Sequence, residues 1–240
     1  MNNTICTAGD HNFPIAGVAE TLRGRGQILS RVFYPLLNDS RTVHGYLFVC
    51  LFRRDLVEAR RIRFRPDITM CENEMFILDY LLSVTALAAV RKPLYDYLRF
   101  ETSACTTYYR REGNWKRERN RFLRAQEKLR IFTAGGLAGA DPATAQRLAF
   151  LVFYHEARAI CCDPSLSRGQ RRHALADLRA RFRRERIAAR GFGAKLFAWV
   201  LAWARPLLPL LLWAKRRADE IRRRVVTVRV ECGKWVNRVD

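Results

Sequence analysis

Residues 114–132 read NWKRERNRFLRAQEKLRIF and predict a long helix that stops at Gly135-Gly136. A second helix is predicted to begin at Asp141-Pro142, because aspartate suits the N-cap and a proline at the first helical position loses no hydrogen bond. Ser165 or Ser167 is the expected cap of a third helix. Three successive helices predict that this half of the chain is helical almost throughout.

The upstream half has a more mixed pattern. Residues 45–52, GYLFVCLF, are apolar, aromatic and β-branched, which is typical of a strand or of the start of a buried helix. Residues 72–84 predict a helix that is buried over most of its surface. A short strand is expected at Ala88-Ala89-Val90, before the break at Pro93. Residues 21–31 and 32–37 carry short helical patterns. Together these segments predict an α-rich α/β chain.

The composition fits a folded domain with a basic appendage. The chain has 240 residues, of which 49% are hydrophobic, so a real core is expected. The formal net charge is +21 and the sequence pI is about 10.7. Most of the excess positive charge lies after Ser167. This charge predicts attraction to polyanions, which include nucleic acid, anionic lipid and sugar diphosphates.

The cysteines indicate reduced thiols. There are seven, an odd number, and no C-x-x-C spacing occurs in the chain, so neither a disulfide framework nor a zinc site is predicted. Cys161 and Cys162 are adjacent, which fits neither pattern. The first ten residues are polar and lack the apolar core of a signal peptide. A cytoplasmic location is therefore expected.

The order of features from Tyr46 to Ser103 is more specific than any single feature. Four segments follow one another there: Phe52-Arg53-Arg54-Asp55, Ile62-Arg63-Phe64, Glu72-Asn73-Glu74-Met75-Phe76 and Lys92-Pro93-Leu94-Tyr95-Asp96-Tyr97. This series resembles the acceptor-side half of the bacterial family 2 (GT-A) glycosyltransferases that build capsule and other surface polysaccharides. The resemblance implies that residues 1–112 form the incomplete distal half of a GT-A domain.

The resemblance also implies where a catalytic base lies. Inverting glycosyl transfer needs a base to deprotonate the acceptor hydroxyl, and the family takes it from an acidic pair at a helix start. Here that pair is Glu72-Asn73, and an amide does not accept the proton. Glu72 or Glu74 is therefore the expected base, with Asn73 orienting the acceptor. The alternative is that both glutamates only stabilise the helix N-terminus. Phe76 and Tyr80, one turn apart, are expected in the core.

Four further residues are candidates for substrate binding. Arg53 and Arg54 are placed by the resemblance near the donor diphosphate, and because adjacent side chains diverge, at most one of them serves there. Tyr95 and Tyr97 are candidates for acceptor contact, because they share one side of a predicted strand. The alternatives are solvent exposure for the arginines and core packing for the tyrosines.

The family's donor site has no counterpart in these 240 residues. No two aspartates are spaced as Asp-x-Asp, and Gly24-Arg25-Gly26 lacks the third glycine of a phosphate loop. The chain alone is therefore expected to bind no metal or other cofactor, whereas Mg²⁺ or Mn²⁺ with a nucleotide sugar is expected for the full-length family. The predicted function is transfer of a sugar to a glycan or lipid-linked acceptor by a truncated enzyme, which is not expected to be active without the donor-binding half.

An apolar stretch follows the helices at residues 192–214, and basic clusters lie on both sides of it. A membrane-crossing helix is disfavoured because Arg205, Pro206 and Pro209 interrupt this stretch. An interfacial hairpin on the inner face of the cell membrane is predicted instead, with a buried core helix as the alternative. The residues expected to contact the membrane are Trp199, Trp203, Arg205 and Trp213.

A rival prediction is a basic, non-catalytic protein that binds nucleic acid or an anionic membrane surface. Residues 168–172 and 179–184 are rich in arginine and would follow phosphates. No zinc finger, basic zipper or RNA-recognition signature is present, so no specific nucleic-acid partner is expected. The predicted organisation is a partial GT-A domain at 1–112, a helical extension at 113–190 and a membrane-surface tail at 191–240.

Overall fold

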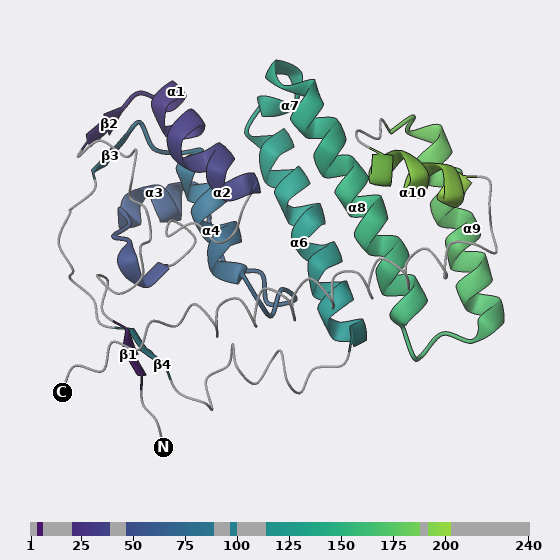
Figure 1. The fold of residues 1–240 in the computed structure, drawn as a ribbon. Coiled ribbons are helices and arrows are strands. Elements are labelled where there is room, and N and C mark those ends of the chain that lie inside the picture. The colour runs from purple at the N-terminus through teal and green to yellow at the C-terminus, as the bar shows by residue number, and fades with distance from the viewer. Residues whose placement is uncertain are drawn as a thin grey trace, which may run out of the picture. The chain divides into compact units, whose positions relative to one another are not determined.

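The computed structural model describes residues 4–6, 21–38, 47–88, 97–99, 114–187 and 192–202. The chain divides into two compact units, Met1–Ser165 and Leu166–Asp240. Its described part is mostly helical with short strands, which confirms the α-rich prediction (Figure 1). The predicted boundaries near residues 112 and 190 fall outside the described residues.

Most of the described elements belong to the first unit. In chain order they are β1 (Thr4–Cys6), β2 (Thr21–Arg23), α1 (Arg25–Ile28), the π-helical segment η1 (Leu29–Phe33), α2 (Tyr34–Asn38), the 3₁₀ turn η3 (Leu47–Val49), α3 (Arg54–Ala59), α4 (Glu72–Leu81), β3 (Ala86–Ala88), β4 (Tyr97–Arg99), α6 (Asn114–Ala134), α7 (Leu137–Ala140) and α8 (Pro142–Cys162). The second unit contains α9 (Arg168–Arg184) and α10 (Phe192–Ala202).

The strands form two antiparallel pairs. Strand β1 pairs with β4, and β2 pairs with β3, with Thr21 opposite Ala88. The predicted short strand near Ala88 is therefore present, two residues earlier than expected. The helical pattern predicted over 21–31 is wrong at its start, because pairing with β3 draws residues 21–23 into a strand. Of the two readings of residues 45–52, the strand is not formed over the described residues 47–52: residues 47–49 make a 3₁₀ turn, and residues 50–52 belong to no helix or strand.

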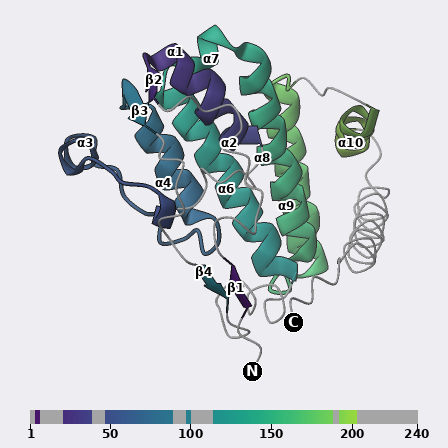
Figure 2. The same ribbon diagram turned by 60° about the vertical axis from the view of Figure 1, so that its left-hand side comes forward.

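Helices α6 and α8 lie side by side and antiparallel, and α4 packs beside α6 (Figures 1 and 2). Helices α1 and α2, joined by η1, form one continuous helix next to α4 (Figure 1). The core between these helices contains Phe33, Leu78, Ile131, Phe132 and Leu148, all with almost no exposed surface. Helix α3 stands at the margin of this unit and buries none of its side chains (Figure 2).

The predicted stop of α6 at two glycines is confirmed. Gly136 has a φ of 70°, a left-handed conformation that glycine adopts without steric cost. Gly135 donates its backbone N–H to the Ile131 carbonyl at 2.9 Å. A Cβ on Gly135 would lie 2.9 Å from both methyl groups of Leu82 and 3.2 Å from the Ile131 carbonyl oxygen, so the Leu82 side chain would have to move to admit one. The two glycines therefore serve different purposes, one in the turn and the other in close packing.

The predicted helix caps are also formed. Asp141 accepts a hydrogen bond from the Thr144 backbone N–H at 3.0 Å and caps α8. For α9 the structure selects Ser167 over Ser165: the Ser167 hydroxyl accepts from the Gln170 N–H at 3.2 Å, and the Gln170 side chain accepts from the Ser167 N–H at 2.9 Å. This reciprocal pair is a capping box.

In the second unit, α10 packs on α9 through apolar side chains. Leu178 and Phe182 of α9 are buried, as are Phe197 and Leu201 of α10. The buried guanidinium of Arg179 donates from Nε to the Leu201 carbonyl at 2.6 Å, near the C-terminal end of α10. A cation at that end also interacts favourably with the helix dipole.

The predicted membrane tail is described only in part. Helix α10 covers residues 192–202, and its Trp199 is 54% exposed. Trp203, Arg205 and Trp213 lie outside the described residues. Within the described ranges, no helix has both the length and the apolar character needed to cross a bilayer.

Candidate functional site

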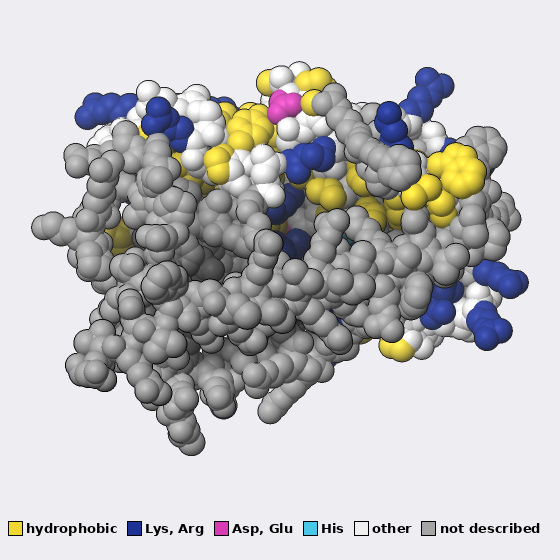
Figure 3. All heavy atoms as spheres, viewed as in Figure 1, with side chains coloured by type: hydrophobic (Ala, Val, Ile, Leu, Met, Phe, Trp, Pro, Cys, Tyr) yellow, Lys and Arg dark blue, Asp and Glu magenta, His cyan; other side chains and the backbone are white. Residues whose placement is uncertain are grey.

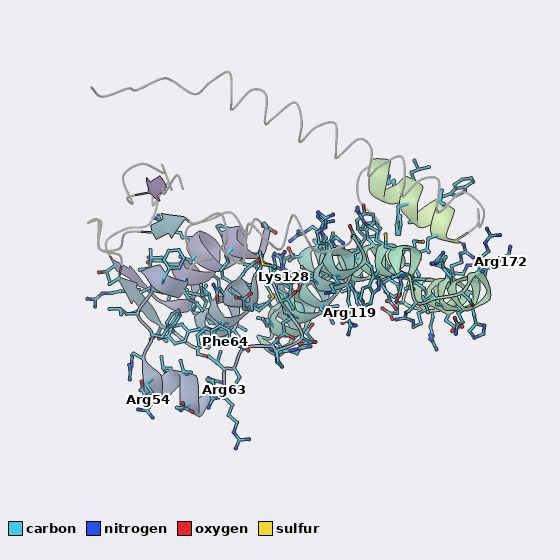
Figure 4. The ribbon with its side chains drawn as sticks, turned by 90° about the horizontal axis from the view of Figure 1, so that it is seen from below. Arg54, Arg63, Phe64, Arg119, Lys128 and Arg172 are labelled. Carbon is cyan, nitrogen blue, oxygen red and sulfur yellow. The ribbon has the colours of Figure 1, made fainter. Side chains whose placement is uncertain are left out.

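Helix α4 has two faces that differ in their surroundings. Glu74, Ile77, Leu78 and Leu81 are buried, and this face packs against α6. Glu72 and Phe76, four residues apart, share another stripe of the helix with Tyr80. The two glutamates that the sequence nominates as a base therefore have different environments. Figure 4 views this region from below.

Glu74 belongs to a buried cluster of charges. Its side chain is 2% exposed, and its carboxylate lies 2.7 Å from Nη2 of Arg124 and 2.5 Å from Nζ of Lys128. Lys128 also donates to the Leu37 carbonyl at 3.0 Å. Burial lowers the pKa of the Lys128 ammonium, and the neighbouring carboxylate opposes that change. The geometry gives Glu74 a role in joining α4 to α6, whereas a general base must reach the acceptor.

Glu72 and Asn73 are half-buried in the first turn of α4. Neither side chain makes a hydrogen bond or ion pair with another described residue. Cys71, just before them, has a φ of 64° and provides no side-chain cap. For a residue other than glycine this left-handed conformation is uncommon, and such conformations cluster at functional sites. A carboxylate and an amide are thus available together at this helix start.

Aromatic rings surround Phe76 on the same side of α4. Phe64 stacks on Phe76 with ring centroids 4.8 Å apart, and Phe52 meets Phe76 edge-on at 5.4 Å. Phe52 also meets Tyr80 edge-on at 4.9 Å, and the Tyr80 hydroxyl accepts from the Arg53 backbone N–H at 2.9 Å. Tyr80 is buried as expected, whereas Phe76 is only half-buried. Phe64 is 50% exposed and leaves part of its ring open to solvent.

Arginines line the segment that leads to these rings. Arg53 forms an ion pair with Asp55, and the hydrogen bond from Arg53 is the main cause that lowers the pKa of the Asp55 carboxyl. Arg63 pairs with Glu58 at 2.5 Å. Arg54 is exposed and forms no ion pair within the described residues. Figure 4 shows Arg54 and Arg63 near Phe64. Of the adjacent arginines 53 and 54, the second is available to a ligand.

Helix α6 holds the loop that presents Phe64. Asn120 accepts from the Thr69 N–H at 2.9 Å through Oδ1 and donates to the Met70 carbonyl at 3.0 Å through Nδ2. Arg65 lies 2.7 Å from a carboxylate oxygen of Glu127, which is almost fully buried. Arg65, directly after Phe64, and the Thr69-Met70 segment are therefore both anchored to α6, which holds this stretch of chain beside the exposed ring.

The thiols near the site are not activated. Burial raises the pKa of Cys50 to about 11 and also raises that of Cys71. Cys161 and Cys162, like these two, are thiols that form no disulfide within the described residues. A thiol with a raised pKa remains protonated at neutral pH and is a poor nucleophile.

The two remaining predicted residues cannot be placed at this site from the described part of the chain. Tyr95 lies outside the described residues, and Tyr97 is placed only through its backbone, in β4 opposite Cys6. No three His, Cys, Asp or Glu side chains in the described ranges are grouped so that they would hold a metal ion. This part of the chain therefore offers no ligand set for the Mg²⁺ or Mn²⁺ that the resemblance implies.

Sequence patterns did not reveal two features of the site. The sequence marks Phe64 only as part of the Ile62-Arg63-Phe64 segment. Its stacking on Phe76 depends on a loop that folds back over α4. A large aromatic between arginines in a turn, Arg63-Phe64-Arg65, was the available signal for an exposed ring. Arg124 and Lys128 as partners of Glu74 had no local signal, because they lie 50 and 54 residues away in sequence.

A scan against protein-family models matched none, and searches of curated proteins and of solved structures found no match to this chain. Its function is therefore inferred from its residues and their geometry.

Proposed function

We propose that the first unit is the acceptor-binding part of an inverting glycosyltransferase, with Glu72 as the general base. The observation that carries this proposal is the contrast between the two glutamates of α4. Glu74 is buried between two cations, whereas Glu72 is half-buried, makes no ion pair in the described part of the chain and precedes Phe76 by one helical turn. Three of the four motif segments meet beside this turn through the rings of Phe52, Phe64 and Phe76, and the fourth, residues 92–97, lies outside the residues whose side chains the structure describes.

The chemistry needs a carboxylate within reach of an acceptor hydroxyl. In the proposed step the hydroxyl oxygen forms a bond to the anomeric carbon of the donor sugar, and its proton passes to the Glu72 carboxylate. The bond from that carbon to the nucleoside diphosphate breaks, and the diphosphate leaves with the electron pair. Asn73 supplies an amide that donates to and accepts from neighbouring acceptor hydroxyls.

The exposed ring of Phe64 suits the acceptor itself. One apolar face of a pyranose ring packs on an aromatic side chain, and sugar sites combine such a platform with a few polar groups. Phe64 is rigidly backed by Phe76, so little conformational entropy is lost when a sugar stacks on it. Arg54 is free of ion pairs in the described residues and suits a negatively charged group, such as the phosphate of a lipid-linked acceptor.

The test is acceptor binding by the 240-residue chain, because that step needs no donor. Saturation-transfer NMR with methyl β-glycosides of glucose, galactose and their N-acetylamino counterparts would identify a bound sugar, and titration would give its Kd. For that sugar, Phe64→Ala is expected to weaken binding roughly three- to tenfold, whereas Phe64→Tyr keeps the stacking ring and the affinity. Glu72→Ala is expected to weaken binding about tenfold through the lost hydrogen bond.

Asp177→Ala is the matched control, since it removes one exposed acid from the second unit. It is expected to leave the Kd unchanged. Failure of every glycoside to bind would overturn the proposal. Equal effects of Glu72→Ala and Asp177→Ala on the Kd would show that Glu72 does not contact the acceptor.

A further inference from the structure

We propose that the second unit binds an anionic phospholipid surface through the exposed arginines of α9 and the exposed tryptophan of α10. This inference is independent of glycosyl transfer, because it rests on different residues in a different unit. It names the partner by its chemistry: phosphate headgroups for the cations and the interfacial region for the aromatic ring.

Positive charge dominates this unit. Its described residues include nine lysines and arginines but only two acids, Asp177 and Glu185. Four of the arginines are exposed, and their side chains form no ion pair or hydrogen bond with another described residue: Arg168, Arg172, Arg184 and Arg186. Exposed cations that form no ion pair retain their full charge for an external partner.

The exposed cations of α9 lie at the two ends of the helix. Arg168 and Arg172 are one turn apart at its start, and Arg184 ends it twelve residues after Arg172. Leu178 and Phe182, between these ends, are buried. Ala176 and Ala180 are short exposed side chains in the middle of the helix. An anionic surface can therefore reach cations at both ends of α9.

Helix α10 adds an apolar component. Phe197 and Leu201 face inward, while Lys195 and Trp199 are exposed and one turn apart. Figure 3 shows apolar side chains over α10, with Lys and Arg side chains around them on the same face. Tryptophan beside lysine is favoured at the boundary between headgroups and acyl chains, because the indole has an apolar body and one N–H donor.

The sequence after α10 favours lipid over nucleic acid. Residues 203–214 read WARPLLPLLLWA, in which five leucines and one tryptophan follow the single arginine. Both polyanions would attract the arginines of α9, so charge does not separate them. Of these two polyanions, only a lipid bilayer also offers an apolar phase to leucine side chains, because nucleic acid provides only stacking for aromatic rings.

The test is flotation of the full chain with vesicles of phosphatidylcholine, with and without about one third phosphatidylglycerol. Binding is expected to the anionic vesicles, with little binding to the neutral ones, and to weaken as salt is raised. Each cation at such a surface strengthens partitioning about fivefold, so the pair Arg168→Gln and Arg172→Gln is expected to weaken it roughly 25-fold. Trp199→Ala is expected to weaken it roughly fivefold.

Matched variants in the first unit control for net charge and for apolar surface. Arg60→Gln with Arg61→Gln removes the same charge from exposed positions, and Phe48→Ala removes an exposed ring. Both are expected to leave partitioning unchanged, and circular dichroism would check that every variant keeps its helices. Equal losses from the Arg60 and Arg61 pair would overturn the proposal, because net charge alone would then explain binding.

A duplex DNA of equal phosphate concentration completes the test. The expected result is that DNA competes weakly with the anionic vesicles and that Trp199→Ala does not change DNA binding. Tight DNA binding with no measurable vesicle binding would overturn the lipid assignment in favour of nucleic acid.

Discussion

Helices α6 and α9 each carry seven lysines and arginines, yet their charges have different environments. On α6, Arg124 and Lys128 pair with Glu74 of α4, and Arg130 pairs with Asp79 of α4 at 3.0 Å and with Glu127 of its own helix at 2.7 Å. On α9 the single acid is Asp177, which lies 3.6 Å from His173. Nearly equal compositions therefore produce a buried seam in one helix and an open cationic surface in the other.

The difference teaches that burial decides what a charge does. A cation removed from water needs a paired, hydrogen-bonded partner, and losing that partner is costly. A cation left in water contributes little to stability and remains available for binding. On this view the buried cations of α6 contribute to stability, whereas Arg168, Arg172 and Arg184 of α9 remain available for the proposed lipid partner.

The sharpest test of the buried seam is Glu74→Ala. It leaves Arg124 and Lys128 without their carboxylate in a buried environment, so it is expected to destabilise the fold by about 4 kcal/mol. Urea denaturation followed by circular dichroism would measure the loss. Glu72→Ala, two residues away and half-exposed, is expected to change stability by less than about 0.5 kcal/mol. Equal effects of the two variants would contradict the two-faced description of α4. If Glu74→Ala does not fold, Glu74→Gln with its smaller loss makes the same comparison.

Arg179 is the exception on α9, because its guanidinium is buried. Arg179→Met removes the hydrogen bond to the Leu201 carbonyl and is expected to cost the α9–α10 pair about 2 kcal/mol. Hydrogen exchange of the α10 amides would report this as roughly thirtyfold faster opening. Arg172→Met, at an exposed position, is expected to leave exchange unchanged. Slow exchange in both variants would mean that the bond to Leu201 does not hold α10.

The caps of α8 and α9 differ in charge, so the stability that each contributes is expected to depend differently on pH. Asp141→Ala and Ser167→Ala are each expected to cost about 1 kcal/mol. The Thr144 N–H lowers the pKa of Asp141, so the stability from its charge is present above the usual pKa near 4 and is lost as pH falls through the lowered value. The Ser167 contribution is expected to stay constant over this range.

Asp141→Asn keeps an acceptor oxygen but removes the titration. Thermal unfolding across the acid range is therefore expected to show the difference between wild type and Asp141→Asn shrinking as pH falls, because the native carboxylate becomes protonated. A difference that does not change with pH would show that the charge of Asp141 contributes nothing to the cap.

The smallest expected effect is on the open surface. Arg168→Gln with Arg172→Gln should change the free energy of unfolding by less than about 0.5 kcal/mol, because neither side chain is paired in the described structure. Arg124→Gln, a smaller charge change, should cost several times more. Comparable losses of unfolding free energy from the two variants would contradict the distinction between the buried charges of α6 and the exposed arginines of α9.

Local features were predictable from the sequence by itself. The stop at Gly135-Gly136, the Asp141 cap and the helical character of residues 114 onward all follow from interactions between residues three or four apart. Such interactions are the same whatever surrounds the helix, which is why they can be predicted. The candidate Glu72 was nominated in the same way, by its place in a motif, although together with Glu74.

Only the tertiary structure decided between those two glutamates. The Glu74 carboxylate is buried and paired with Arg124 and Lys128. The ring of Phe64 stacks on Phe76 because Asn120 holds the loop that follows Phe64. These contacts join residues far apart in sequence, and a charge run has the same appearance whether its partners exist or not. The cations of α6 and α9 are therefore similar in number as sequence, and only packing against α4 pairs Arg124 and Lys128 of α6 with Glu74.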